Sequence, residues 1–258
     1  MSNYPEPESF LQDLEHNAAV IINEVIALEK QNEQYANTME LTKYYNKKNT
    51  IGKVNGWNQI RFLCQDMPFL ELMEKYNLTS TSENPSPEEF QQFKAEYNRL
   101  YNEVFPQTSQ IIKDFYKTHR GKFTNIAIYK LQPDTVIPVH TNYDPHIYRC
   151  HMGLVVPEGD IGMMVEGEKR AWEVGKFFAF DSMRPHTVWN KTKHARYVLS
   201  VDCYRTTDRY DDVVSVHKAL VELRMKESKL SLGLSGGRSQ LNPKIRKMYA
   251  SEHEVHDV

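Results

Sequence analysis

The sequence predicts an α+β fold in which a mainly helical N-terminal region precedes a β-sandwich or jelly roll. Before Gly121, apolar residues recur near helical spacing, with Glu and Gln between them. After Gly121 the chain changes to short β-branched and aromatic segments separated by Pro, Gly, Asn and Asp. From His217 the helical pattern returns. We therefore expect a helical region at 1–120 packing on a β core at 121–210, followed by a C-terminal helix and tail at 211–258.

The helices of the first region are predicted from apolar spacing and from a capping signal. One helical stretch covers 10–28, and a polar stretch at 43–58 interrupts the pattern. Ser86 is suited to cap a helix that begins at Pro87, with Glu88 and Glu89 in its first turn. Two helices are expected there, at about 87–104 and 107–118.

The β core is predicted from short segments of strand-like composition. Many short strands at this spacing are typical of a sandwich or jelly roll. The predicted strands are 123–130, 149–156, 161–165, 176–180 and 196–203.

Composition limits the classes of function. The chain has 258 residues, 40% of them hydrophobic, which is enough for a substantial core. With 32 basic and 34 acidic residues it has no cationic field for nucleic acid or an anionic membrane. No apolar run approaches the roughly 20 residues of a membrane span, and the N-terminus lacks the pattern of a secretory signal. Three widely separated cysteines suggest reduced thiols. We expect a cytoplasmic protein with a small-molecule or peptide substrate, no nucleic-acid or membrane partner, and an oligomeric state that stays open.

Three basic side chains are expected to point toward the inside of the β core. Residues two apart in a strand share a face, so Arg149 lies with His151, and Arg196 lies with Ser200 and Asp202. Burying an unpaired cation is costly. These groups therefore either face solvent or bind an anionic guest, and arginine is suited to bind a carboxylate through two hydrogen bonds. We favour the anionic guest.

His140 and His186 are the candidate metal ligands. Two histidines and one oxygen donor form the facial triad of non-haem iron oxygenases. The position two after His140 holds Asn142, on the same face if the strand is regular, and Asn offers only a neutral oxygen. Asp144 is the nearest carboxylate, but Pro145 suggests that the chain is already turning. Either residue could complete the site, or water could fill the position.

Several motifs together resemble the aspartyl/asparaginyl β-hydroxylase family, in order and spacing from about 123 to 202. The resemblance implies a double-stranded β-helix, a jelly-roll or cupin-like core, that uses Fe(II), 2-oxoglutarate and O2. The motifs are P-x-x-x-I-P-V-H-T-N ending at Asn142, Arg149-x-His151-x-Gly153-Leu154-x-x-Pro157, Trp172-x-x-Gly175-Lys176, Phe180-Asp181 and His186-x-x-Trp189.

The resemblance also implies roles for individual residues. It makes His140 and His186 the iron ligands. Cosubstrate-binding positions fall on five residues: Arg149 and His151, which match residues that contact 2-oxoglutarate; Arg196, which matches the partner of its distal carboxylate; Tyr129, where the family has a smaller hydroxyl residue; and Trp57, which resembles a tryptophan near that pocket.

The implied activity is hydroxylation of an sp3 carbon in an amino-acid-like or peptidyl substrate, with release of succinate and CO2. Asn142 departs from the glycine or aspartate that family members carry there, and a vacant ligand position could admit chloride. The alternatives are therefore a related halogenase or other tailoring enzyme, and a non-catalytic metal-binding jelly roll. We expect Trp172 and Trp189 to be core aromatics, Asp181 and Ser182 to orient His186, and Asp202 to pair with a nearby cation.

Overall fold

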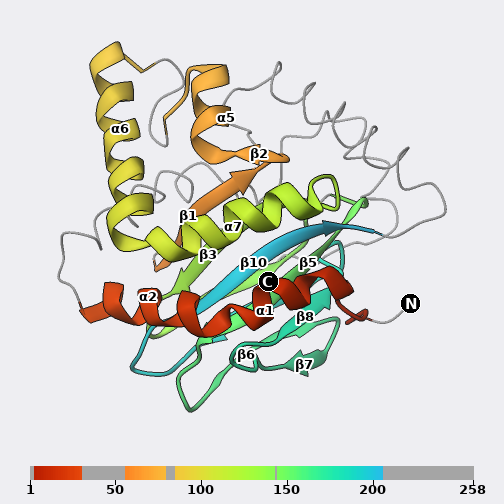
Figure 1. Ribbon diagram of the computed structural model, residues 1–258. Helices are drawn as coiled ribbons and strands as arrows, with labels where there is room; N and C mark the ends of the chain where they lie inside the picture. The colour runs from red at the N-terminus through yellow and green to blue at the C-terminus, as the bar shows by residue number, and fades with distance from the viewer. Residues whose placement is uncertain (1–2, 31–55, 80–84, 143, 206–258) are drawn as a thin grey trace.

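The protein is described by a computed structural model that covers residues 3–30, 56–79, 85–142 and 144–205 (Figure 1). The predicted C-terminal helix and tail at 211–258 lie outside these ranges. In the described ranges, no helix is both long and apolar enough to cross a bilayer. Cys64, Cys150 and Cys203 are buried free thiols, as predicted.

Two antiparallel sheets form the core. The larger has six strands in the order β2-β1-β3-β10-β5-β8, and the smaller has four in the order β4-β9-β6-β7. Their facing sides share an apolar cluster, so the predicted jelly-roll core is confirmed. The strands are β1 (Trp57–Cys64), β2 (Met67–Pro68), β3 (Phe123–Leu131), β4 (Thr135–His140), β5 (Ile147–Val155), β6 (Ile161–Val165), β7 (Glu168–Arg170), β8 (Phe177–Phe180), β9 (His186–Asn190) and β10 (Arg196–Tyr204).

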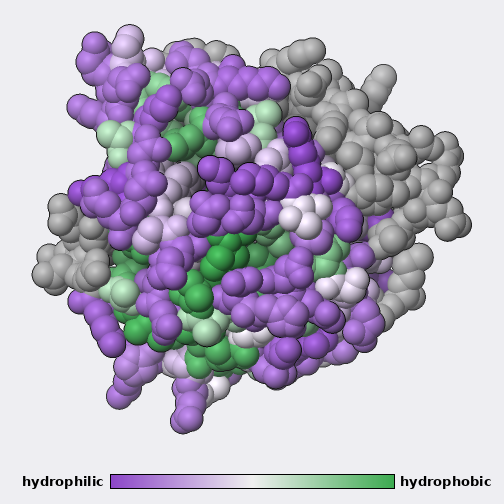
Figure 2. Space-filling model, viewed as in Figure 1, coloured by the Kyte–Doolittle hydropathy of each residue, from purple (hydrophilic) through white to green (hydrophobic). Residues whose placement is uncertain are grey.

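Helices cover the outer face of the larger sheet. Figure 1 shows α1, α2 and α7 lying across this face, and their apolar residues share one cluster with the outward side chains of β3, β5 and β10. Figure 2 shows the same side of the molecule as mainly hydrophilic, with apolar side chains visible near its centre. The helices are η1 (Ser9–Leu11), α1 (Gln12–His16), α2 (Ala18–Lys30), α5 (Phe69–Tyr76), α6 (Pro87–Arg99), η2 (Leu100–Val104) and α7 (Pro106–His119).

Two polar contacts fix the helical layer. Ser86 and Glu89 form the reciprocal capping box that begins α6, so the predicted helix start is confirmed. Glu24 of α2 accepts hydrogen bonds from the backbone N–H groups of Gln107 and Thr108, at 2.9 Å each. This buried carboxylate therefore satisfies free donors at the start of α7, where a negative charge is favourable.

The sequence missed three strands that matter for function. β1 lies in the region predicted to be mainly helical, yet it pairs with β3 in the core sheet. Its polar residues Asn58, Gln59 and Arg61 are buried with the apolar ones, so the alternation that marks a half-exposed strand is absent. β4 contains Pro138, which is tolerated because β4 is an edge strand. β9 is the third, and β4 and β9 carry the two candidate metal ligands.

Candidate functional site

The two candidate metal ligands lie side by side on neighbouring strands. His140 ends β4, His186 begins β9, and the two are direct partners in the antiparallel register. Their ring centroids are 4.1 Å apart. His186 is 3% exposed, and His140 is partly exposed at the edge of the small sheet. The arrangement brings together two residues that are 46 positions apart in the chain (186 minus 140).

Backbone carbonyls fix which nitrogen of each ring can bind a metal. His140 Nδ1 lies 2.8 Å from the carbonyl oxygen of Pro138, and His186 Nδ1 lies 2.8 Å from that of Arg184. A carbonyl only accepts a hydrogen bond, so each Nδ1 carries the proton. The Nε2 lone pair of each ring is then available, which is the usual state of a metal-binding histidine.

Burial keeps these imidazoles uncharged. The pKa of His140 is lowered to about 4, mainly by desolvation and to a smaller extent by the Arg149 guanidinium, while the hydrogen bond to Pro138 opposes the shift. Desolvation, with His140 as the second cause, lowers the pKa of His186 well below its usual range. Desolvation also lowers the pKa of His151, aided by Arg196 and Arg149. At neutral pH all three rings are therefore neutral.

These lowered pKa values predict that the metal-free protein loses stability in mild acid. Below an unfolded-state pKa of about 6.5, the unfolded chain protonates its histidines while the buried His151 and His186 stay neutral. The unfolded state then binds more protons, so the free energy of unfolding falls as the pH drops from about 6.5. Urea unfolding between about pH 5 and pH 8 measures this slope. His186→Gln should reduce the slope, and His194→Gln, at an exposed position, should not; equal slopes in all three proteins would contradict the prediction.

No carboxylate joins the two histidines. Among the described residues, no group of three or more His, Cys, Asp or Glu side chains could hold a metal ion. The Asp144 carboxylate instead accepts a hydrogen bond from the backbone N–H of His146 at 3.1 Å, as in an Asx turn. β4 ends at His140, so the assumption that Asn142 continues a regular strand is wrong. Asn142 is nevertheless buried next to the turn that precedes His186. Its backbone N–H donates to the Ser182 carbonyl oxygen there at 2.8 Å.

Arg149 is already neutralised by a neighbour on β10. Its Nε and Nη2 donate to the two carboxylate oxygens of Asp202 at 2.7 and 3.0 Å. Arg149 and Asp202 are partners in the β5–β10 register, which places both side chains on the inner face. The predicted pairing of Asp202 with a cation is confirmed. The expectation that Arg149 needs an anionic guest is wrong, because Asp202 supplies its negative charge.

Arg196 has no such partner. It is 2% exposed, and no hydrogen bond or ion pair of its side chain is found within the described part of the chain; its Nε is buried without an acceptor. Its guanidinium carbon lies 4.4 Å from the centroid of the Trp172 ring. Desolvation lowers its pKa to about 9, so it remains protonated at neutral pH. A buried cation without a counter-ion favours the binding of an anion.

His151 and Ser200 place further unsatisfied polar atoms beside Arg196. The two residues are register partners on β5 and β10. His151 Nε2 and Ser200 Oγ are both buried without a hydrogen-bond partner. Trp172 Nε1 lies 3.4 Å from His151 Nδ1, so His151 accepts there and carries its proton on Nε2. Both atoms can therefore donate to a polar guest that Arg196 attracts.

Trp172 is the functional residue that sequence analysis underestimated. It was expected to be a core aromatic, and it is buried, but it also contacts both Arg196 and His151. The 171–176 segment docks on β5 at Gly153, where an added Cβ would lie 2.7 Å from the Glu173 carbonyl oxygen. The glycine of the Arg149-x-His151-x-Gly153 motif thus admits the segment that carries Trp172.

Tyr129 and Trp57 extend this cluster. The Tyr129 ring packs edge-on against His151, with centroids 6.0 Å apart. Trp57 packs edge-on against Tyr129 at 5.6 Å. The structure thus brings all the predicted site residues of β1, β3, β5 and β10 to the inner face of the larger sheet. This includes Trp57, which lies in the region predicted to be mainly helical.

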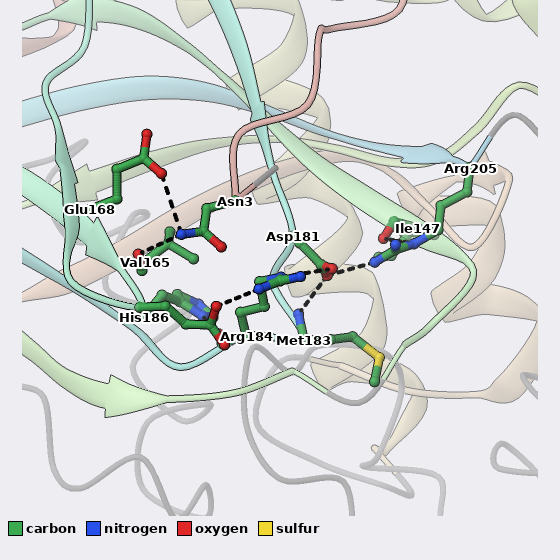
Figure 3. Close-up of polar contacts among 10 residues, drawn as sticks. Asn3, Ile147, Val165, Glu168, Asp181, Met183, Arg184, His186 and Arg205 are labelled. Carbon is green, nitrogen blue, oxygen red and sulfur yellow. Dashed lines mark hydrogen bonds and ion pairs between the residues drawn. The ribbon is translucent and has the colours of Figure 1, made fainter. Parts of the chain in front are cut away.

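A tight turn between β8 and β9 supports the second histidine. Figure 3 shows Asp181 between Arg184 and Arg205, with His186 close to Arg184. Asp181 accepts a hydrogen bond from Arg205 at 2.5 Å and one from the Met183 backbone N–H at 3.1 Å. The carbonyl that orients His186 belongs to Arg184 in the same turn.

A family profile and several known proteins match this chain in sequence. The sequence profile of the aspartyl/asparaginyl beta-hydroxylase family matches residues 15–206. Mouse aspartyl/asparaginyl beta-hydroxylase is 29% identical over 99 residues, which are 38% of this chain and 13% of the mouse protein. The ornithine lipid ester-linked acyl 2-hydroxylase of Rhizobium tropici is 34% identical over 73 residues, 28% of this chain and 26% of that protein. The chain therefore spans only a small part of these relatives.

Among solved structures, a predicted oxalate decarboxylase from Thermotoga maritima is 18% identical. The match covers 34% of this chain and 73% of the Thermotoga protein, with a TM-score of 0.28.

Proposed function

Because the chain belongs to the aspartyl/asparaginyl beta-hydroxylase family, we propose that it is an Fe(II)- and 2-oxoglutarate-dependent hydroxylase. When bound, iron together with 2-oxoglutarate and O2 supplies the oxidising power that inserts oxygen into an sp3 C–H bond, with release of succinate and CO2. His140 and His186 would hold the metal through Nε2. Two protein imidazoles without a carboxylate leave several positions for the cosubstrate, O2 and water, or for the oxygen of Asn142.

The buried, uncompensated guanidinium of Arg196 is the observation that carries the proposal. A diacid such as 2-oxoglutarate can place one carboxylate on Arg196 and chelate the metal with its other end. His151 and Ser200 are register partners on the same inner face, with Ser200 four residues along β10 from Arg196, and their Nε2 and Oγ atoms could donate to the same guest. Arg149, neutralised by Asp202, lies on the same inner face as His151 and would line the metal-bound end of the guest.

The apolar walls of the pocket would exclude water. Phe178 and Phe180 pack edge-on against His151, with centroids 6.3 and 5.1 Å away. Tyr129 lies on another side of the same ring. Contacts between guest and protein are stronger where water is excluded, and competing hydrolysis is suppressed. These apolar surroundings of His151 therefore suit a small anion that must be held in one orientation.

The substrate that we propose is a free or carrier-bound amino acid or a small peptide, and the reaction is hydroxylation at carbon. Incubation of the protein with Fe(II), ascorbate and 2-oxoglutarate tests the activity, with succinate as the product to detect. A metabolite and peptide pool, scored by mass spectrometry for gain of one oxygen atom, then identifies the substrate. Replacement of hydrogen by chlorine would instead indicate halogenation. Absence of succinate under both conditions would reject the oxygenase and favour a non-catalytic metal binder.

Trp172 variants separate two ways in which the pocket holds 2-oxoglutarate. Trp172→Phe keeps an aromatic face for Arg196 but loses the indole N–H, and a net hydrogen bond of about 1 kcal/mol predicts a roughly 5-fold rise in Kd. Trp172→Leu also loses the cation–π contact, worth about 2 kcal/mol when desolvated, which predicts a rise of roughly 30-fold or more. Isothermal titration with 2-oxoglutarate in the presence of a redox-inert divalent metal measures both values.

Trp189→Phe is the matched control. Trp189 is partly exposed on β9, and its indole N–H donates to Asp160 at 2.6 Å. The ring that lies against Arg196 is that of Trp172. Its replacement should leave the Kd of 2-oxoglutarate unchanged. A wild-type Kd in Trp172→Leu would contradict the role of the indole face.

A further inference from the structure

We propose that Asp181 is a positioning residue for the metal ligand His186, acting through the Arg184 carbonyl. The inference rests on the proposed function, because it assigns to the β8–β9 turn the task of holding one metal-binding ring. The turn consists of the residues at 181–185, and His186 follows it directly as the first residue of β9. Its side chains form a chain of opposite charges that reaches the ends of β6 and β10 (Figure 3).

The orientation of the His186 ring depends on where the Arg184 carbonyl lies. That carbonyl oxygen is 2.8 Å from His186 Nδ1, so it fixes both the tautomer and the rotation of the ring. His186 is buried against Phe180, and its centroid is 4.1 Å from that of His140. A displaced carbonyl would therefore turn the His186 Nε2 lone pair away from the metal position that it would share with His140.

Asp181 closes the turn that carries this carbonyl. Its backbone oxygen accepts a hydrogen bond from the Arg184 N–H at 3.1 Å, and its carboxylate accepts one from the Met183 N–H at 3.1 Å. The carboxylate also lies 3.6 Å from Arg184 Nε, an ion-pair distance. One acidic residue thus restrains Arg184 from its backbone and from its side chain.

Two further contacts hold the turn from outside. Arg205, after β10, donates to the Asp181 carboxylate at 2.5 Å and to the Ile147 carbonyl at 3.2 Å, which ties the turn to the start of β5. On the other side, Glu166 forms an ion pair with Arg184 Nη1 and donates its backbone N–H to the Pro185 carbonyl at 3.0 Å. The carboxylates of Asp181 and Glu166 therefore balance the cations of Arg184 and Arg205.

Asp181→Asn is the informative substitution because it keeps the size of the side chain. The asparagine oxygen can still accept from the Met183 N–H, whereas the charge that holds Arg205 and Arg184 is lost. Loss of a group that orients a metal ligand typically costs about 10- to 100-fold in metal affinity. We expect a loss of this size in the affinity for Co(II), measured by isothermal titration and by the visible absorption of the bound ion. Glu166→Gln should cause a smaller loss in the same direction, because the Asp181 contacts remain.

Asp160→Asn is the matched control. Asp160 also pairs with a cation and a neighbouring side chain, Lys191 at 3.0 Å and Trp189 at 2.6 Å, but it has no contact with the β8–β9 turn. Its Co(II) affinity should equal that of the wild type. Nitrogen NMR of the metal-free proteins gives a second readout: His186 should be protonated on Nδ1 alone in the wild type and in Asp160→Asn, and should populate both tautomers in Asp181→Asn.

The outcomes separate the positioning role from the metal site itself. A wild-type protein that binds no Co(II) would reject the metal site, and the positioning role with it. Normal wild-type binding together with unchanged affinity and tautomer in Asp181→Asn would overturn the positioning role alone. If Asp181→Asn fails to fold, Arg205→Gln, which removes the cation paired with the Asp181 carboxylate, takes its place, and wild-type affinity with a single tautomer in that variant would overturn the role.

Discussion

Replacement of His140 or His186 by alanine is expected to abolish 2-oxoglutarate turnover and to remove metal binding. The described residues offer no third His, Cys, Asp or Glu at the pair, so each substitution removes half of the imidazole donors. Loss of a partner that only orients a metal ligand lowers the affinity for metal by about 10- to 100-fold. Loss of the ligand itself should lower it by more than roughly 100-fold. Isothermal titration with Co(II) and a succinate assay with Fe(II) measure the two effects.

His194→Ala is the control for these variants. His194 is an exposed residue in the β9–β10 connection and lies on no strand. It should bind metal and turn over like the wild type. Succinate production at the wild-type rate by His140→Ala or His186→Ala would refute the assignment of the metal ligands.

Replacement of Arg196 by methionine should weaken 2-oxoglutarate binding strongly and leave the protein at least as stable. Truncating one partner of a buried charge pair costs about 2–5 kcal/mol, which corresponds to roughly 30-fold or more in Kd. In the protein without its guest, however, Arg196 is a buried cation that lies against the Trp172 ring and pairs with no carboxylate among the described residues. A methionine of similar length removes the desolvation cost of that charge, so the free energy of unfolding should stay the same or rise.

Arg149→Met is the matched comparison, since Arg149 is equally a buried arginine on the inner face. Its removal leaves the Asp202 carboxylate buried without its cation. Breaking such a pair costs about 3–5 kcal/mol of stability. Urea unfolding should therefore place Arg149→Met well below the wild type and Arg196→Met at or above it. Equal destabilisation by the two substitutions would show that Arg196 has a compensating partner.

The sequence predicted which face of the sheet carries the candidate site residues better than it predicted the strands that hold them. Arg149, His151 and Arg196 could be placed on one face because the period of a strand is two, and the observed β5–β10 register agrees. His140 and His186 were predicted as ligands of one metal, but their register as partners on adjacent strands could not be predicted, since Pro138 and the shortness of β9 hide two of the strands. The alternation of residues along a strand predicts the face on which a residue lies. It does not predict which residue of the next strand lies beside it.

Which of the two arginines pairs with Asp202 was also beyond the sequence. Arg149 and Arg196 carry the same charge in similar strands, yet Asp202 lies opposite Arg149 while Arg196 lies opposite Leu131 of β3. Only the register distinguishes the neutralised arginine from the one that needs a guest. Trp172 is a buried core aromatic, as predicted, but its contacts with Arg196 and His151 could not be predicted, because its loop docks on Gly153 rather than following any local pattern.

The most direct test of the central claim is an anaerobic titration of the protein with Fe(II) and 2-oxoglutarate, followed by visible absorption. The keto acid gives a charge-transfer band when it chelates Fe(II), so the band reports metal and diacid bound at one place. We expect a saturable band in the wild type, none in His186→Ala, and in Arg196→Met a band that requires roughly 30-fold or more 2-oxoglutarate. A wild-type protein that gives no band, or an Arg196→Met protein that saturates at the wild-type concentration, would contradict the account.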